Sequence, residues 1–124
     1  MFLCNQQIYE NYQKLAKAFL NETRYFPAKA NFVIQKNLKV FFEAAQEIEN
    51  MRLNIIKNYG ELKDNQSIIY PENIQIANKE LNDLSNIEQD INILYLQLKD
   101  IEDIEFTPAQ MGAILFMIKD EGEE

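Results

Sequence analysis

The residues of this chain that could carry chemistry are mainly carboxylates, because the other usual catalytic groups are scarce. The sequence has no histidine, one cysteine (Cys4) and three glycines. Without histidine there is no Ser-His or Cys-His nucleophile system and no imidazole metal ligand. One cysteine cannot build a structural zinc site, and three scattered glycines cannot form a phosphate-binding loop. The sequence therefore favours a protein that is not an enzyme and that holds no cofactor.

Carboxylates crowd one short segment near the C-terminus, and they are Asp100, Glu102, Asp103 and Glu105. Oxygen ligands of this kind can hold a divalent cation, but no glycine turn or ligand spacing here matches a calcium loop. We therefore expect no metal, and instead a solvated acidic turn or a surface for a basic partner. Such a surface could occupy a basic groove that otherwise takes nucleic acid.

The charge of the chain is concentrated at its C-terminal end. The net charge is −8, from 12 basic and 20 acidic residues, and residues 100–124 hold 1 of the basic and 8 of the acidic ones. Phosphate backbones and anionic membrane surfaces are bound mainly through Lys and Arg. The charge therefore argues against nucleic acid and against a membrane as direct partners.

Aromatic side chains are frequent in the first third of the chain, and most fall at helical spacing, which is typical of core packing. Tyr25, Phe26 and Phe32 are the exception, because they cluster around Pro27 between two expected helices. This aromatic corner either holds the two helices together or anchors a protein partner. The same third holds the only candidates for a nucleotide pocket, which are also typical of solvated helix faces: Lys14, Lys17, Arg24, Lys29, Lys36 and Lys39.

Hydrophobic spacing and proline positions predict a mainly α fold in a single domain over residues 1–124. No proline or glycine lies between Pro27 and Gly60, which predicts one long central helix at about 27–59. Asn37 and Arg52 interrupt its apolar stripe, which favours an antiparallel helical hairpin over a parallel coiled coil. A first helix is expected at about 4–22, with an apolar face made by Ile8, Tyr12, Leu15 and Phe19.

The second half of the chain is predicted to contain two further helices. Residues 60–71 are typical of a loop, and helices are expected at about 72–86, directly after Pro71, and at about 108–118, beginning at Pro108. Residues 91–98 are partly apolar on both faces, so the pattern fits a short strand at 91–97, paired with 103–106 in a β-hairpin. A helical face through Ile87, Asp90, Leu94 and Leu98 fits part of the same segment. The acidic tail is expected to fray from about residue 119.

Four sequence features, taken in order, carry a family resemblance. An aromatic-proline corner at 25–28 (YFPA) precedes a long helix that ends at 58–61 (NYGE), and a helix containing 78–81 (NKEL) follows. An Ile/Leu-rich segment then runs into 98–108 (LKDIEDIEFTP). In these features the chain resembles a family of small uncharacterised proteins encoded by tailed phages and prophages of low-GC bacteria. The resemblance implies a phage origin and a place in the host bacterial cytoplasm, and it supplies no catalytic residues.

A small acidic phage protein without catalytic groups is expected to act by binding a protein. The leading hypothesis is an inhibitor of a host antiviral-defence protein, bound through the acidic segment and the aromatic corner. The alternative is a virion-assembly component, such as a tail or connector protein or an assembly chaperone. A helical hairpin suited to self-association as a homodimer favours that alternative. A sponge for a nucleotide signal ranks third, because it needs a basic pocket.

Overall fold

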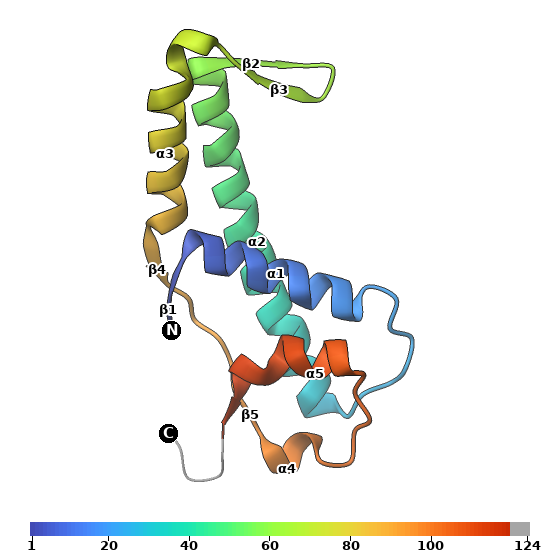
Figure 1. The fold of residues 1–124 in the computed structure, drawn as a ribbon. Coiled ribbons are helices and arrows are strands. Elements are labelled where there is room, and N and C mark those ends of the chain that lie inside the picture. The colour runs from blue at the N-terminus through green and yellow to red at the C-terminus, as the bar shows by residue number, and fades with distance from the viewer. Residues whose placement is uncertain (120–124) are drawn as a thin grey trace.

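The computed structural model describes residues 1–119, and most of them are helical (Figure 1). The mainly α prediction is confirmed by the α-helices α1 (Asn5–Phe19), α2 (Ala28–Tyr59), α3 (Ile74–Asn86), α4 (Leu98–Ile101) and α5 (Pro108–Ile114). Two 3₁₀ turns precede α3 and follow α5, and they are η1 (Pro71–Asn73) and η2 (Leu115–Met117). Short strands form separate pairs: β1 (Phe2–Cys4) with β4 (Glu88–Asp90), β2 (Gly60–Lys63) with β3 (Gln66–Ile69), and β5 (Leu96–Gln97) with β6 (Ile118–Lys119).

Helices α1, α3 and α4 pack on the long helix α2, and α5 packs mainly on α1 (Figure 1). The C-terminal half of α2 lies beside α3, and the β2–β3 hairpin projects where the two helices join. This is the antiparallel helical hairpin that the interrupted stripe predicts. Helix α1 crosses the middle of α2, while α4 and α5 lie near its N-terminal half. Fully buried side chains from several of these elements form the core, among them Ile8, Leu15, Ile34, Phe41, Leu96, Ile114 and Met117.

The predicted helix bounds agree with the structure except at two ends. Helix α2 and the η1–α3 segment match the predicted 27–59 and 72–86. Helix α1 ends at Phe19, earlier than the predicted 22, because the chain turns there and the Glu22 amide donates to the Phe19 carbonyl at 3.3 Å. The predicted 108–118 helix is α5 followed by the 3₁₀ turn η2, which ends at Met117 because Ile118 joins β6 and pairs in parallel with Leu96 of β5.

The prediction of a loop at 60–71 is wrong, because residues 60–69 form an antiparallel hairpin. Gly60 pairs with Ile69 at its base, and Lys63 pairs with Gln66 next to the turn. The turn residues Asp64 and Asn65 have φ angles of 51° and 63°, which Asp and Asn tolerate better than most residues. Gly60 is required by a close approach, since a Cβ atom there would lie 1.9 Å from the Ile68 carbonyl oxygen.

The prediction for 91–106 is correct only for a short strand, and its pairing with 103–106 is wrong. The strand β5 pairs with β6, residues 98–101 are helical, and 103–106 contain no strand. The alternative helical face is also not adopted, because residues 91–95 are extended or irregular. The Asn37 side chain, which is fully buried in α2, accepts from the Leu94 amide at 2.8 Å and donates to its carbonyl at 2.9 Å. The Asn37 side chain therefore makes the hydrogen bonds to the Leu94 backbone that a paired strand would otherwise make.

The last described element of the chain is the strand β6. Lys119 belongs to β6, where its ammonium lies 3.9 Å from the centroid of the Tyr95 ring. The rest of the predicted frayed tail, residues 120–124, lies outside the described residues. Through residue 119, none of the helices combines the length and the apolar character needed to cross a bilayer.

Candidate functional site

The structure brings the aromatic corner and the acidic segment to the same end of the molecule, although they are far apart in sequence. Residues 100–106 lie against residues 24–29, near the start of α2 and α4 in Figure 1. The Lys29 ammonium lies 3.0 Å from the Asp100 carboxylate. The Phe26 and Phe106 rings lie 5.4 Å apart, and Arg24 donates to the Glu105 carbonyl. We call the exposed part of this end the basal surface, and it comprises Tyr25, Phe32, Glu102, Asp103 and Glu105.

The aromatic corner divides into one structural residue and two accessible ones. Phe26 is only 6% exposed and packs edge-on against Phe19 at a centroid distance of 6.2 Å. Tyr25 and Phe32 are 86% and 60% exposed, respectively. The spacing of Phe32 and Lys36 places them on one face of α2 with Lys29. Tyr25 and Phe32 border a hollow whose other lining residues are Ala28, Asn31, Gln35, Lys36 and Lys39.

The acidic segment is also divided, because Asp100 serves the fold. Its carboxylate accepts a hydrogen bond from the backbone amide of Gln97 at 2.9 Å, and this bond caps α4. The Asp100 side chain is only 12% exposed. This backbone hydrogen bond, with a smaller contribution from Lys29, lowers the pKa of Asp100 below its ordinary value. Glu102, Asp103 and Glu105 are exposed. These three carboxylates are therefore the ones that a partner can reach.

A polar network centred on Gln110 holds the basal surface together, and the sequence analysis missed it. The Gln110 amide group donates to the Glu22 carboxylate at 2.7 Å and to the Ala18 carbonyl at 3.2 Å. Its oxygen accepts from the Arg24 guanidinium at 2.9 Å and from the Thr107 amide at 3.1 Å. The only sequence signal was the spacing of Thr107 and Gln110, which forms a capping box at the start of α5.

The carboxylate of Glu22 is the most strongly perturbed group of this network. It accepts two hydrogen bonds from the Arg24 guanidinium, both at 2.9 Å, as well as the one from Gln110. The side-chain hydrogen bond from Arg24 is the largest cause that lowers the pKa of Glu22 to about 2, followed by the bond from Gln110. The same pair raises the pKa of Arg24. The loop between α1 and α2 is thus tied to α5 by an ionised, hydrogen-bonded cluster.

The six basic residues considered for a nucleotide pocket do not converge. Arg24 is engaged by Glu22, and Lys29 is paired with Asp100. Lys14 and Lys17 border a separate hollow against α5, whereas Lys36 and Lys39 border the hollow beside Phe32. The fold therefore spreads these charges over different faces.

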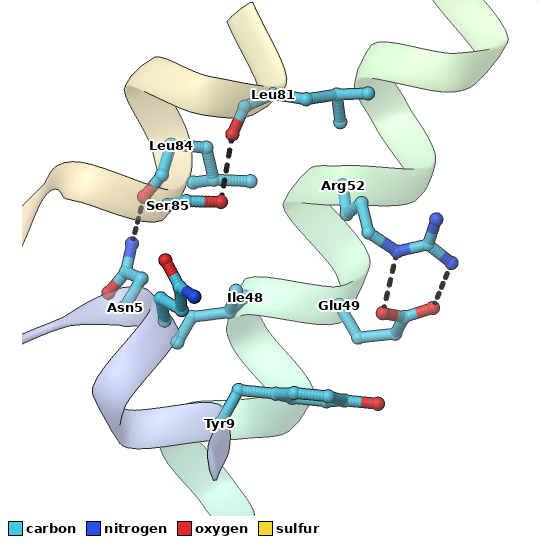
Figure 2. Close-up of a pocket in the computed structure, with 9 residues that line it drawn as sticks. Asn5, Tyr9, Ile48, Glu49, Arg52, Leu81, Leu84 and Ser85 are labelled. Atoms are coloured by element: carbon cyan, nitrogen blue, oxygen red, sulfur yellow. Dashed lines mark hydrogen bonds and ion pairs between the residues drawn. The ribbon is translucent and has the colours of Figure 1, made fainter. Parts of the chain in front are cut away.

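A further hollow, of about 350 Å³, lies between α1, α2 and α3 (Figure 2). Glu49 and Arg52 form a two-bond ion pair on its wall, with distances of 2.9 and 2.6 Å. This pairing lowers the pKa of Glu49 and raises that of Arg52. Figure 2 also shows Asn5 donating to the Leu84 carbonyl at 2.8 Å and Ser85 donating to the Leu81 carbonyl at 3.0 Å. The polar groups of this hollow mostly satisfy one another, so we do not assign chemistry to it.

Neither a metal-binding cluster nor a similar protein indicates a role for this chain within residues 1–119. Among residues 1–119, no three histidine, cysteine or carboxylate side chains are grouped so that they could hold a metal ion. No protein-family model matches the chain, and neither a curated protein nor a solved structure is significantly similar to it. The basal surface must therefore be interpreted from its own residues.

Proposed function

We propose that this chain is a non-enzymatic phage protein that binds and inhibits a host antiviral-defence protein through the basal surface. The observation that carries the proposal is the exposure of Tyr25 and Phe32, at 86% and 60%, at the same end of the molecule as three exposed carboxylates. Large aromatic side chains are typical anchors of protein interfaces, because they remove much apolar area from water when they dock. An aromatic pair next to an acidic cluster fits a basic surface that contains an apolar hollow.

The electrostatics of the basal surface define the kind of partner further. Glu102, Asp103 and Glu105 can meet Lys and Arg side chains of a partner, which steers the encounter and fixes its orientation. Defence proteins that act on nucleic acid need basic grooves to hold phosphates. An acidic surface with aromatic anchors can occupy such a groove and exclude the substrate. Asp100 is not part of this surface, since α4 and Lys29 already use its carboxylate.

A pull-down from a bacterial host, with bound proteins identified by mass spectrometry, tests this proposal. One variant carries Tyr25→Ser and Phe32→Ser, and another carries Glu102→Gln, Asp103→Asn and Glu105→Gln. We expect one dominant host protein with wild type and its loss with both variants. The matched controls are Phe2→Ser, where the replaced ring is 72% exposed, and the triple exposed-carboxylate variant Glu10→Gln, Glu47→Gln and Glu88→Gln. Retention by both basal variants would contradict the proposal.

The alternative, a virion-assembly component, is favoured by a different observation. The α2–α3 hairpin ends in the projecting strands β2 and β3, which form a pair of their own and are suited to self-association (Figure 1). This alternative predicts that phage structural proteins are recovered in the same pull-down and that a deletion phage forms no particles. Normal particles from the deletion phage would count against it.

A further inference from the structure

The β2–β3 hairpin lies at the end of the molecule opposite the basal surface (Figure 1). Among residues 1–119 it forms a sheet of its own, so within this part of the chain each of its strands has one edge without a strand partner. Two-stranded sheets are marginally stable in water, and open edges are templates for further strands. Ile68 is 40% exposed and Leu62 is 38% exposed, so the hairpin also presents apolar side chains to solvent.

The register of the hairpin identifies which backbone groups of β3 face outward. The Tyr70 amide donates to the Tyr59 carbonyl at 3.1 Å, and hydrogen-bonded pairs alternate with non-hydrogen-bonded pairs in an antiparallel ladder. Ile68 with Glu61 is therefore a hydrogen-bonded pair, and Ser67 with Leu62 is not. The amide and carbonyl groups of Ser67 and Ile69 consequently point away from β2, toward the open edge.

The two edges differ in how they are protected from pairing. Strand β2 carries Glu61 and Lys63, and charged side chains are a usual defence of an edge strand. Strand β3, with the sequence QSII, has no charge and no proline. The open edge of β3 is therefore the better template.

The charge around the hairpin favours a second copy of this chain as the occupant. The net charge of −8 is concentrated in residues 100–124, which hold 1 basic and 8 acidic residues, so two copies repel each other most strongly through that segment. Residues 51–76 carry equal numbers of basic and acidic residues, a net of zero, from Arg52, Lys57 and Lys63 against Glu61, Asp64 and Glu72. Two copies that meet at this end keep their acidic segments 100–105 far apart, because the hairpin lies at the opposite end of the molecule.

We propose that β3 pairs antiparallel with β3 of a second copy about a two-fold axis at Ile68. Ser67 then forms a hydrogen-bonded pair with Ile69 of the other copy. The two-fold axis generates the equivalent pair, Ile69 with Ser67 of the other copy. Ile68 faces Ile68 of the other copy in a non-hydrogen-bonded pair, which lies between the two hydrogen-bonded pairs and brings the side chains closest together. The product is a continuous antiparallel sheet of order β2-β3-β3-β2. This interface is independent of the basal surface, so either proposal can fail without the other.

Disulfide trapping tests the register directly. The full chain carries Ile68→Cys together with Cys4→Ser, which removes the native thiol. In the proposed dimer the two introduced thiols face each other with Cβ atoms about 5 Å apart, so mild oxidation gives a covalent species of twice the chain mass. Leu62→Cys in the same background is the control, because its exposure is similar and it lies on β2. Failure of Ile68→Cys to cross-link, or equal cross-linking of Leu62→Cys, would overturn the proposal.

Sedimentation of the unoxidised protein provides a second measurement. Wild type should show a concentration-dependent dimer, and Ile68→Lys should raise the dissociation constant about tenfold or more by placing like charges opposite each other. Leu62→Lys should leave the dissociation constant nearly unchanged. A wild-type protein that stays monomeric at every concentration, or a dimer lost through Leu62→Lys instead, would contradict pairing through β3.

Discussion

The basal half of the molecule and its hairpin end are stabilised in different ways. In the basal half, hydrogen bonds join residues far apart in sequence. Examples are Gln110 with Ala18 and Asn37 with Leu94, at sequence separations of 92 and 57 residues. At the hairpin end, the side-chain amide of Asn73 donates to the Tyr59 carbonyl, 14 residues away in sequence. The Tyr59 hydroxyl donates to the Glu80 carboxylate, 21 residues away. The basal half is therefore a product of tertiary packing, whereas the hairpin end is built from chain neighbours.

This difference suggests a division of labour between the two ends. The basal half combines buried side chains with ionised networks, so it can hold exposed aromatics and carboxylates in fixed positions. The strands β2 and β3 contain no buried residue, so little apolar area holds them in place. Regions of this kind open locally at low free-energy cost and gain most from a partner. The predictions below test this contrast, from the largest expected effect to the smallest.

The largest effect is expected from Asn37→Ala in the basal half. This change removes the fully buried Asn37 amide group and leaves both partly buried backbone groups of Leu94 without their partner, so the free energy of unfolding should fall by about 2 kcal/mol. Urea denaturation measures the change. Asn54→Ala, an exposed position on the same helix, is the control and should alter stability by no more than about 0.5 kcal/mol. Equal effects of the two variants would break the contrast.

Acid should weaken the basal half through Glu22. Its pKa of about 2 in the folded protein lies below the ordinary 4.5, so the folded state favours the ionised form. The resulting stability is fully present above about pH 4.5 and is lost as the pH falls toward 2. The urea midpoint should therefore drop between pH 6 and pH 3, and Glu22→Gln should flatten that dependence. An unchanged slope in Glu22→Gln, with Glu47→Gln as the exposed control, would show that the cluster is not stabilising.

A local effect is expected from Gly60→Ala at the hairpin end. The added Cβ atom would lie 1.9 Å from the Ile68 carbonyl oxygen, so the ladder must shift or open. Hydrogen exchange of the Ile68 amide should accelerate about tenfold or more, while global stability falls by less than about 1 kcal/mol. Gly112→Ala is the control, because no atom lies within 4 Å of a Cβ atom at that position. A large global loss in Gly60→Ala would show that the hairpin belongs to the same cooperative unit as the base.

The smallest expected effect on stability is the difference between a structural carboxylate, Asp100, and an exposed one, Asp103, in the acidic segment. Asp100→Ala removes the cap of α4 and the ion pair with Lys29, so it should cost about 1 kcal/mol. Asp103→Ala, at an exposed position, should change stability by less than about 0.5 kcal/mol while weakening partner binding. Thermal denaturation and the pull-down together measure both. The reverse pattern would place Asp100 in the interface and Asp103 in the fold.

Strong periodic patterns were predictable from the sequence, and short strands were not. The apolar stripe between Pro27 and Gly60 gave α2, and the Thr107-Pro108 pair gave the start of α5. The hairpin at 60–69 was read as a loop because its strands are short and exposed, although Asp64-Asn65 is a suitable two-residue turn. The pairing of β5 with β6 had no local signal, because its strands are 2 residues long and far apart in sequence.

The candidate site was predictable in its residues but not in its arrangement. Exposed aromatics and clustered carboxylates are visible as residue types, so both halves of the basal surface were found. The sequence does not show that Phe26 is buried while Tyr25 is exposed, because neighbouring residues in a non-helical turn can point in opposite directions. Nor does it show that Asp100 is a cap.

The sequence by itself determined the helices α1, α2, α3 and α5, the absence of histidine chemistry and the location of the charge, because these follow from local spacing and composition. Tertiary structure alone decided that residues 24–29 meet residues 100–106 and that Asn37 binds Leu94. It also decided that the edge of β3 stays open. Each of these depends on contacts between distant segments, whose partners are chosen by packing the whole core and by satisfying buried polar groups.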